Sequence, residues 1–196
     1  MYNNKNNIII YGGAFNPPTR AHQKIVSEIC KMFPEKKLLI LPANDFYNKN
    51  NMESFNDRVE MLKLMIKDIK GNIEISRYEE TNPKYEGTYN TLEVFNHPLF
   101  VIGSDSLNDL PQWICANKLI RDNKFIVFPR KGYDIMKIIR SHELLRKNED
   151  HFIVLDTFEE VDISSTDYRE RNKTDTIIPS INKYIEENNL YNRRKK

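Results

Sequence analysis

The sequence is poor in the residues that build several common kinds of site. It has two cysteines, Cys30 and Cys115, and four histidines among 196 residues, and none of them has the spacing of a zinc site. We therefore expect no protein-held metal, and two buried free thiols in a reducing compartment. The Gly-x-Ser-x-Gly turn of serine hydrolases is also absent.

Long apolar runs and a strong charge of one sign are missing as well. No stretch reaches the length of a transmembrane helix, and residues 1–7 are polar, so we expect no membrane span, no signal peptide and a cytoplasmic protein. The net charge is +2, and the tail 193–196 carries four of the positive charges. Without that tail, 26 basic residues face 28 acidic ones, a balance that predicts no nucleic-acid partner.

What the sequence does have is a regular alternation of two kinds of segment. Apolar runs of strand length occupy 8–10, 37–41, 72–76, 99–102, 125–128 and 151–155. Between them lie helical patterns, which include 21–33, a helix capped by Ser54, 88–95, 106–110, 113–120, 134–146 and 179–189; residues 79–87 read as a loop. The alternation predicts an α/β fold, a doubly wound parallel sheet in a single domain over 1–196. The sheet would lie within 1–160, and 161–196 would form a small C-terminal helical cap.

The first strand runs into the most informative stretch, residues 8–22. Gly12 and Gly13 follow three isoleucines, where glycine allows a positive φ and a close approach to a ligand. Thr19 can cap the next helix, and His22 lies three residues on, hence on the same helix face. This combination predicts an anion-binding corner at the carboxyl end of a strand.

Polar residues also follow the other predicted strands. They occur at 44–49, 103–105, 130 and 164–169, and the ends of parallel strands meet at one edge of a sheet. The resulting rim is rich in cations and amides, which bind phosphates. Phosphoryl and nucleotidyl transfer need little more than positioning and charge stabilisation, so such a rim suits them.

Two segments resemble the signatures of the nucleotidyltransferase superfamily. Residues 12–22 resemble Gly-x-Phe-Asp-Pro followed by His/Thr-x-Gly-His, and 163–169 resemble Ile-Ser-Ser-Thr-x-x-Arg. Residues 88–92, residues 103–107 with Trp113, and the ending 178–191 are similar to bacterial nicotinate-nucleotide adenylyltransferases. The resemblance implies a Rossmann-like fold. It also implies that ATP and nicotinate mononucleotide give deamido-NAD and pyrophosphate, with Mg²⁺ bound through the ATP phosphates.

The resemblance also implies site residues. The catalytic residues would be His22, Thr19 and Arg169. The ATP-binding residues would be Gly12, Gly13, Phe15, Gly103, Asp105, Ser164 and Ser165. The mononucleotide-binding residues would be Lys49, Thr88, Trp113 and Arg130. A phosphate nucleophile is already anionic at neutral pH, so no general base is needed, and we expect His22 to be at least partly protonated when it donates to bound phosphates.

Four positions depart from the usual pattern of this family. Thr19 replaces a histidine, Ala21 a glycine, Asn16 an aspartate and Asn48 a histidine. We expect the change at Asn16 to remove a charge near the phosphates. None of the four changes removes a group that must transfer a proton.

Other functions stay open at this point. The acceptor could be nicotinamide mononucleotide or another phosphate, and an acid-against-amide assay would separate these. A non-catalytic nucleotide sensor would not need His22 and Arg169, which are both present. An RNA-binding protein would need an aromatic platform that the sequence does not show. The oligomeric state, including a homo-oligomer, is not decided by the sequence.

Overall fold

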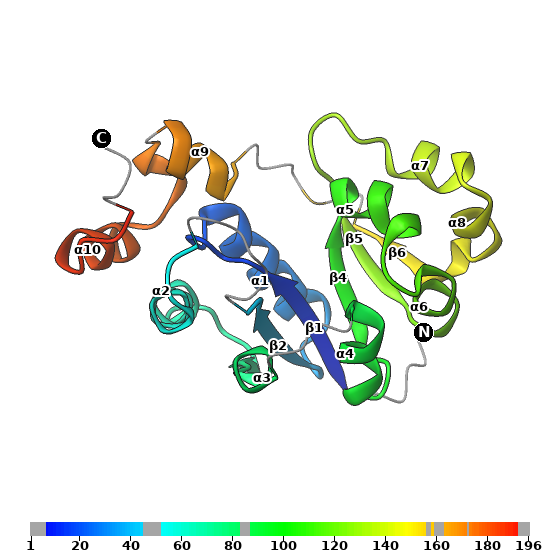
Figure 1. The fold of residues 1–196 in the computed structure, drawn as a ribbon, viewed down its shortest axis with the longest axis horizontal. Coiled ribbons are helices and arrows are strands. Elements are labelled where there is room, and N and C mark those ends of the chain that lie inside the picture. Colours follow the sequence, from blue (N-terminus) through cyan, green and yellow to red (C-terminus); the bar gives the residue numbers. More distant parts are fainter. Residues whose placement is uncertain are drawn as a thin grey trace.

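The computed structural model describes residues 7–44, 52–82, 87–155, 158, 163–171 and 173–191. In this part of the chain six strands form one parallel sheet in the order β3-β2-β1-β4-β5-β6 (Figure 1). Their bounds are β1 Ile8–Gly13, β2 Lys37–Pro42, β3 Ile73–Ile75, β4 Leu99–Gly103, β5 Phe125–Phe128 and β6 Phe152–Val154. The predicted doubly wound parallel sheet is therefore confirmed.

Helices connect the strands and cover both faces of the sheet. They are α1 Arg20–Met32, α2 Phe55–Ile66, α3 Tyr78–Thr81, α4 Thr88–Val94, α5 Ser104–Asp109, α6 Ala116–Asp122, α7 Ile135–Ser141, α8 Glu143–Lys147, α9 Ser165–Arg171 and α10 Pro179–Glu187. Short 3₁₀ turns lie at Leu110–Gln112, Glu149–His151 and Thr174–Thr176. No helix in the described part of the chain is both long and apolar enough to cross a membrane.

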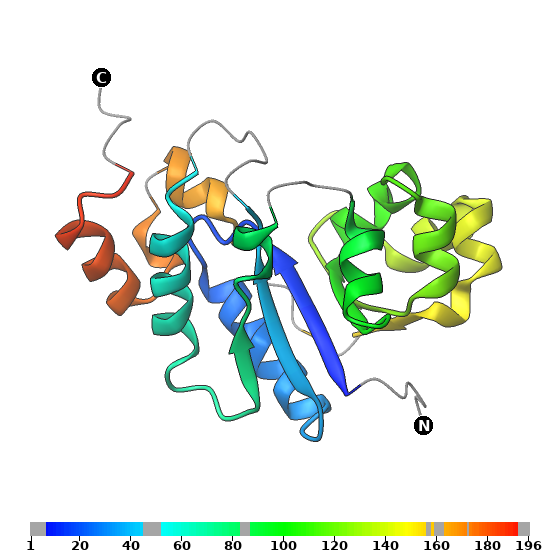
Figure 2. The ribbon, with the colours of Figure 1, turned by 60° about the horizontal axis from the view of Figure 1, so that its bottom comes forward.

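The sheet divides the core into two layers, because successive strand residues point to opposite faces. In β1, Ile9 and Tyr11 pack with α1, α2 and the C-terminal helices, while Ile10 packs with α4 to α8. Figure 2 shows these two groups of helices on opposite sides of the strands. Burial on both faces explains why the strands read as continuous apolar runs.

The strand order reverses direction between β1 and β4. The chain moves outward from β1 through β2 to β3, then returns to place β4 on the other side of β1. In open α/β sheets a ligand binds in the crevice at the carboxyl ends of the two strands that flank such a reversal. The site is therefore expected above the ends of β1 and β4.

Three sequence-based expectations were wrong. Residues 78–81, read largely as loop, form α3, and the single helix expected over 134–146 is two helices, α7 and α8, separated by an extended residue, His142. Ile139 and Leu145 are both buried although six residues apart, a spacing off the helical period that the break accommodates. Cys30 is buried as expected, but Cys115 is exposed and begins α6 with φ 58°.

Candidate active site

Gly12 and Gly13 end β1 in a tightly packed place. A Cβ atom on Gly12 would lie 3.3 Å from the Phe100 ring, and one on Gly13 would lie 3.1 Å from the Phe15 ring. Neither glycine has a positive φ, in contrast to the sequence expectation; the positive φ of this turn, 48°, belongs to Phe15. A Cβ atom at either position would fit only if the neighbouring ring moved slightly, so glycine suits this place.

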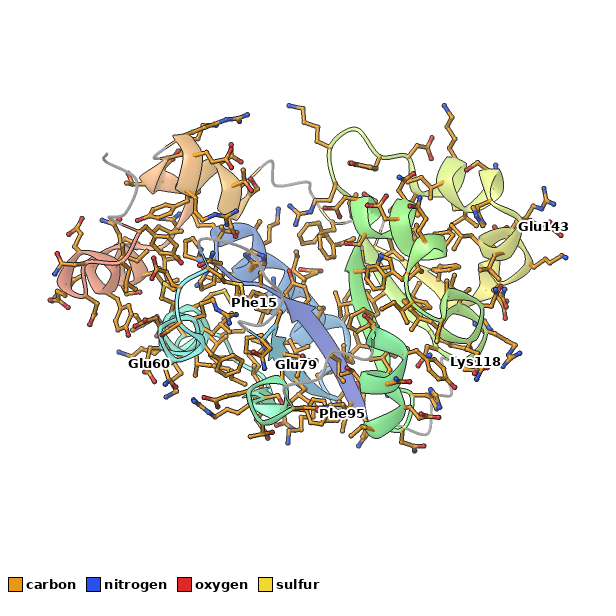
Figure 3. The ribbon with its side chains drawn as sticks, in the orientation of Figure 1. Phe15, Glu60, Glu79, Phe95, Lys118 and Glu143 are labelled. Atoms are coloured by element: carbon orange, nitrogen blue, oxygen red, sulfur yellow. The ribbon has the colours of Figure 1, made fainter. Side chains whose placement is uncertain are left out.

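Phe15 supports the turn from inside the protein. Its side chain is 1% exposed and packs edge-on against Tyr11 and His22, with ring centroids 5.3 and 5.1 Å apart. Figure 3 shows it at the carboxyl end of β1. Any contact of Phe15 with ATP would therefore come from its main chain.

Thr19 and His22 form one hydrogen-bonded unit at the start of α1. Thr19 is the extended N-cap residue, and its main-chain N–H donates to His22 Nδ1 over 2.9 Å. Thr19 Oγ1 lies 2.8 Å from the same nitrogen. Because Nδ1 accepts the main-chain hydrogen bond, the ring proton of neutral His22 lies on Nε2. Burial of the ring, followed by the positive charge of Arg130, lowers the pKa of His22 to about 3. His22 is thus neutral in the free protein, and its protonation on phosphate binding stays a prediction.

This lowered pKa predicts a specific loss of stability in acid. Between the ordinary pKa of 6.5 and the folded value of about 3, the unfolded chain binds more protons at His22 than the folded protein does. The free energy of unfolding should therefore fall as the pH falls through this range. In urea titrations between about pH 7 and pH 4, the variant His22→Asn should show a shallower decline than the wild type, because it keeps an acceptor for Thr19 N–H without a titrating ring. Exposed His142→Asn is the control, and a decline in His22→Asn as steep as in wild type would contradict the neutral ring.

The second signature segment begins with a helix cap. Ser164 Oγ donates to Asp167 Oδ2 over 2.6 Å, the Ser164 amide donates to the same oxygen, and the Asp167 amide donates back to Ser164 Oγ. The hydrogen bond from the Ser164 hydroxyl is the main cause of a lowered pKa at Asp167. Ser164 therefore caps α9, and its predicted contact with ATP would need a rearrangement of these bonds.

The next residues of α9 bind the loop that follows β1. Ser165 Oγ donates to the main-chain oxygen of Pro17 over 2.8 Å, and Arg169 Nη1 donates to that of Asn16 over 2.5 Å. The two signatures, about 150 residues apart, thus meet as the sequence predicts. The Asn16 side chain is 5% exposed and points into the protein, where its Oδ1 accepts from the Glu53 amide and the Tyr191 hydroxyl. The expectation that this position bears on charge beside the phosphates stays a prediction.

Arg58, on α2, holds the same loop from the other side and was missed from the sequence. It is 0% exposed, and its guanidinium donates to the main-chain oxygens of Glu53, Ala14 and Ala43 over 3.0, 2.8 and 2.7 Å. Ala14 and Ala43 follow β1 and β2, so one side chain ties two strand ends together. The available signal was an arginine inside the apolar stripe of an amphipathic helix.

A third group of predicted residues lies above β4 and β5. A Cβ atom on Gly103 would collide with the Asp105 carboxylate. Ser104 Oγ accepts a hydrogen bond from the Arg130 amide over 2.8 Å. The Arg130 guanidinium lies over the Phe128 ring, and its Nε is 3.9 Å from Asp105 Oδ1, without a hydrogen-bond partner in the described structure. Asp105 and Arg130 thus present opposite charges side by side at the rim.

A cavity of about 330 Å³ opens at the ends of β1, β2 and β4. It is lined by Gly12, Gly13, Ala14, Leu41, Ala43, Met52, Glu79, Thr88, Thr91, Leu92, Phe100, Ser106 and Trp113. Thr88 and Trp113, both predicted to contact the mononucleotide, are therefore brought together with the predicted phosphate turn. Arg130 is not among the lining residues, and Lys49 lies outside the described residues.

Glu79 is the charged side chain of this wall and was also missed from the sequence. It is 7% exposed, and Thr91 Oγ1 donates to its Oε1 over 3.4 Å. Its main-chain oxygen accepts from the Asn44 amide group. No other ionisable residue is found among the described lining residues, and Figure 3 labels Glu79 at α3, the helix to which it belongs. The cavity wall thus offers two aromatic side chains, hydroxyls and one carboxylate.

Metal ligands do not converge in the described residues. Over these residues no three His, Cys, Asp or Glu side chains are placed to hold one ion. The other polar groups of the site are cations, hydroxyls and main-chain amides, beside the carboxylates of Glu79 and Asp105. Such a set suits an anionic substrate that is positioned rather than covalently attacked by the protein.

Comparisons with known proteins agree with this arrangement. Residues 10–171 match the family described as cytidylyltransferase-like. The chain is 36% identical over 193 residues to a probable nicotinate-nucleotide adenylyltransferase of Clostridium botulinum, covering 93% of this chain and 96% of that one. It is 33% identical over 191 residues to one from Acholeplasma laidlawii, covering 94% and 97%.

Solved structures show the same fold. The nicotinic acid mononucleotide adenylyltransferase of Plasmodium falciparum complexed with NaAD superposes with a TM-score of 0.79 at 22% identity, covering 96% of this chain and 98% of that one. The same enzyme complexed with APC gives a TM-score of 0.77 at 23% identity, with the same coverage. At this level of sequence identity, the likeness establishes the fold alone.

Proposed function

The chain belongs to the cytidylyltransferase-like family, and on that premise we propose that it is a nicotinate-nucleotide adenylyltransferase. It transfers the adenylyl group of ATP to nicotinate mononucleotide, releasing pyrophosphate and deamido-NAD. The observation that carries the proposal is the contact between the two signature segments. Arg169 and Ser165 reach the loop after β1, directly beside a cavity that contains Thr88 and Trp113.

The proposed reaction is a direct in-line displacement. A phosphate oxygen of the mononucleotide attacks the α-phosphorus of ATP, and the bond from that phosphorus to the β-phosphate oxygen breaks. His22 donates through Nε2–H to the phosphates, since Nδ1 is occupied by the Thr19 amide. The Arg169 guanidinium adds further donors to the developing negative charge, and so does the Thr19 hydroxyl once it turns from His22 Nδ1 to the phosphates.

We propose that ATP lies across the ends of β1 and β4. Gly12, Gly13 and the main chain of Phe15 would face the triphosphate, and Ser164 and Ser165 would approach it from α9. The Asp105 carboxylate, partly exposed beside Gly103, would accept from the adenosine ribose hydroxyls. Mg²⁺ would be held by the phosphates, which suits its preference for phosphate oxygens and water.

The mononucleotide would occupy the cavity. Trp113 would stack on the pyridine ring, and Thr88, the first residue of α4, would contact the nicotinate carboxylate. Glu79 would repel both anionic groups of this substrate, so its carboxylate suits the ribose hydroxyls. Arg130 and Lys49 are proposed to bind the mononucleotide phosphate or the pyrophosphate.

We also propose that the chain works as one domain in the cytoplasm. Helix α10 packs against α2, and the Tyr184 hydroxyl on α10 donates to Asp57 Oδ1 over 3.0 Å. These contacts support the proposal that α10 belongs to the same functional unit as the sheet.

A direct assay tests the substrate. With Mg-ATP, kcat/KM for pyrophosphate release should be at least about tenfold higher with the acid mononucleotide than with the amide. This corresponds to a difference of about 1.4 kcal/mol in transition-state binding. Nicotinamide mononucleotide is the second candidate, because the buried Glu79 could accept from an amide group. Equal turnover of the two would contradict the assignment.

Trp113→Ala should raise KM for the mononucleotide about tenfold and leave KM for ATP nearly unchanged.

A further inference from the structure

The last described residue, Tyr191, returns from the end of α10 to the loop that follows β1. Its hydroxyl donates to Asn16 Oδ1 over 2.8 Å, and its main-chain N–H donates to Glu53 Oε1 over 2.8 Å. Its ring packs edge-on against Tyr168 of α9, with the centroids 5.7 Å apart. Burial raises the pKa of the Tyr191 phenol far above its ordinary value, so the hydroxyl remains a donor.

Asn16 is the point where these contacts converge. Its Oδ1 accepts from Tyr191 and also from the Glu53 amide over 3.1 Å, and its main-chain oxygen accepts from Arg169 Nη1. Its side chain is 5% exposed. A buried oxygen that loses one of its donors costs free energy, so the position of Asn16 depends on Tyr191.

The rest of the loop is held in the same manner. The main-chain oxygens of Ala14, Asn16 and Pro17 accept from Arg58, Arg169 and Ser165 respectively. Two residues after Pro17, the loop ends at Thr19, the N-cap residue of α1. A small displacement of Asn16 would therefore move Thr19 and His22, and errors of about 1 Å in such positions can cost about a hundredfold in rate.

We propose that Tyr191 is a positioning residue for adenylyl transfer, which sets the loop 14–19 through its hydrogen bond to Asn16. This inference rests on the proposed function. It gives a physical reason for the ending Leu190-Tyr191, which follows the last helix and forms no part of the cavity wall in the described structure. Tyr191 acts through Asn16 and needs no contact with substrate.

The test compares two tyrosines of the C-terminal segment. Tyr191→Phe should lower kcat about tenfold, with KM for ATP and for the mononucleotide changed by less than about threefold. Tyr184→Phe is the matched control. It also removes a hydrogen bond from a tyrosine hydroxyl, but that bond goes to Asp57 on α2 and not to the loop. Its kcat should remain that of the wild type. Asn16→Ala combined with Tyr191→Phe should fall no further than Asn16→Ala alone, since the two residues act as one unit.

Amide hydrogen exchange tests the role of Tyr191 independently of the proposed function. Exchange at the amides of residues 14–16 and 19, the non-proline residues of the loop, should be faster in Tyr191→Phe than in Tyr184→Phe, whichever substrate the wild type uses. A chain ending at Tyr191 should match the wild type in this exchange, while one ending at Leu190 should resemble Tyr191→Phe. If the wild type is active and Tyr191→Phe keeps its kcat, or if both tyrosine variants exchange alike, Tyr191 does not position the loop. If the wild type shows no adenylyl transfer, the proposed function fails, and the exchange comparison still decides the positioning.

Discussion

Replacing His22 by alanine should lower kcat for adenylyl transfer by about a hundred- to a thousandfold, the usual cost of losing one donor to a transition-state oxygen. The ring is fixed by the Thr19 amide at Nδ1, which leaves Nε2–H as the donor. The attacking phosphate needs no base, so the loss should fall on kcat with little change in KM. Initial rates of pyrophosphate release at saturating substrates measure it.

Two further substitutions at the same position separate the two ring nitrogens. His22→Asn can keep an acceptor for the Thr19 amide but has no donor at the place of Nε2, while His22→Gln can place an amide donor near Nε2. If donation to phosphate is the role of His22, the glutamine variant should retain clearly more activity than the asparagine variant. The reverse order would show that the Nδ1 hydrogen bond, and with it the shape of the helix start, is what matters.

The sequence predicts those parts of this protein that depend on neighbouring residues. The three isoleucines before Gly12, the threonine cap at 19 and the alternation of apolar runs are local patterns, and each predicts β1, α1 or the sheet correctly. The meeting of residues 163–169 with the first loop was predicted through the resemblance of both segments to one family. The break at His142 was not, because an apolar stripe on both sides of it hides the interruption.

Local sequence patterns did not predict the contacts that fix the geometry of the site. Arg58, Glu79 and Tyr191 form hydrogen bonds with residues 44, 12 and 175 positions away in the chain. Nothing in the neighbouring sequence indicates such partners. The partners of the Asn16 side chain were not predicted for the same reason: Tyr191 and Glu53 lie far from it in the sequence.

Two arginines near the Phe55 ring give the sharpest test of the contacts made by Arg58. Arg58 and Arg77 both lie over the Phe55 ring, with the guanidinium carbons 5.3 and 5.5 Å from its centroid, but only Arg58 is buried. Arg58→Met keeps most of the apolar stem and leaves the main-chain oxygens of Glu53, Ala14 and Ala43 without this donor. We expect it to lower the free energy of unfolding by about 4 kcal/mol, because buried acceptors that lose a charged donor are costly.

Arg77→Met supplies the matched control for that loss. Arg77 makes an exposed ion pair with Glu80 and an exposed contact with Asn56, so its replacement should cost less than about 1 kcal/mol. Both variants lose a cation over the same ring, so the excess loss in Arg58→Met reports mainly on its three buried main-chain hydrogen bonds. Urea unfolding measures it, with the slope m unchanged if only stability is affected. Ala14 and Ala43 follow β1 and β2, so Arg58→Met should also loosen the loop after β1. If Arg58→Met is as stable as Arg77→Met, this loop is held without Arg58.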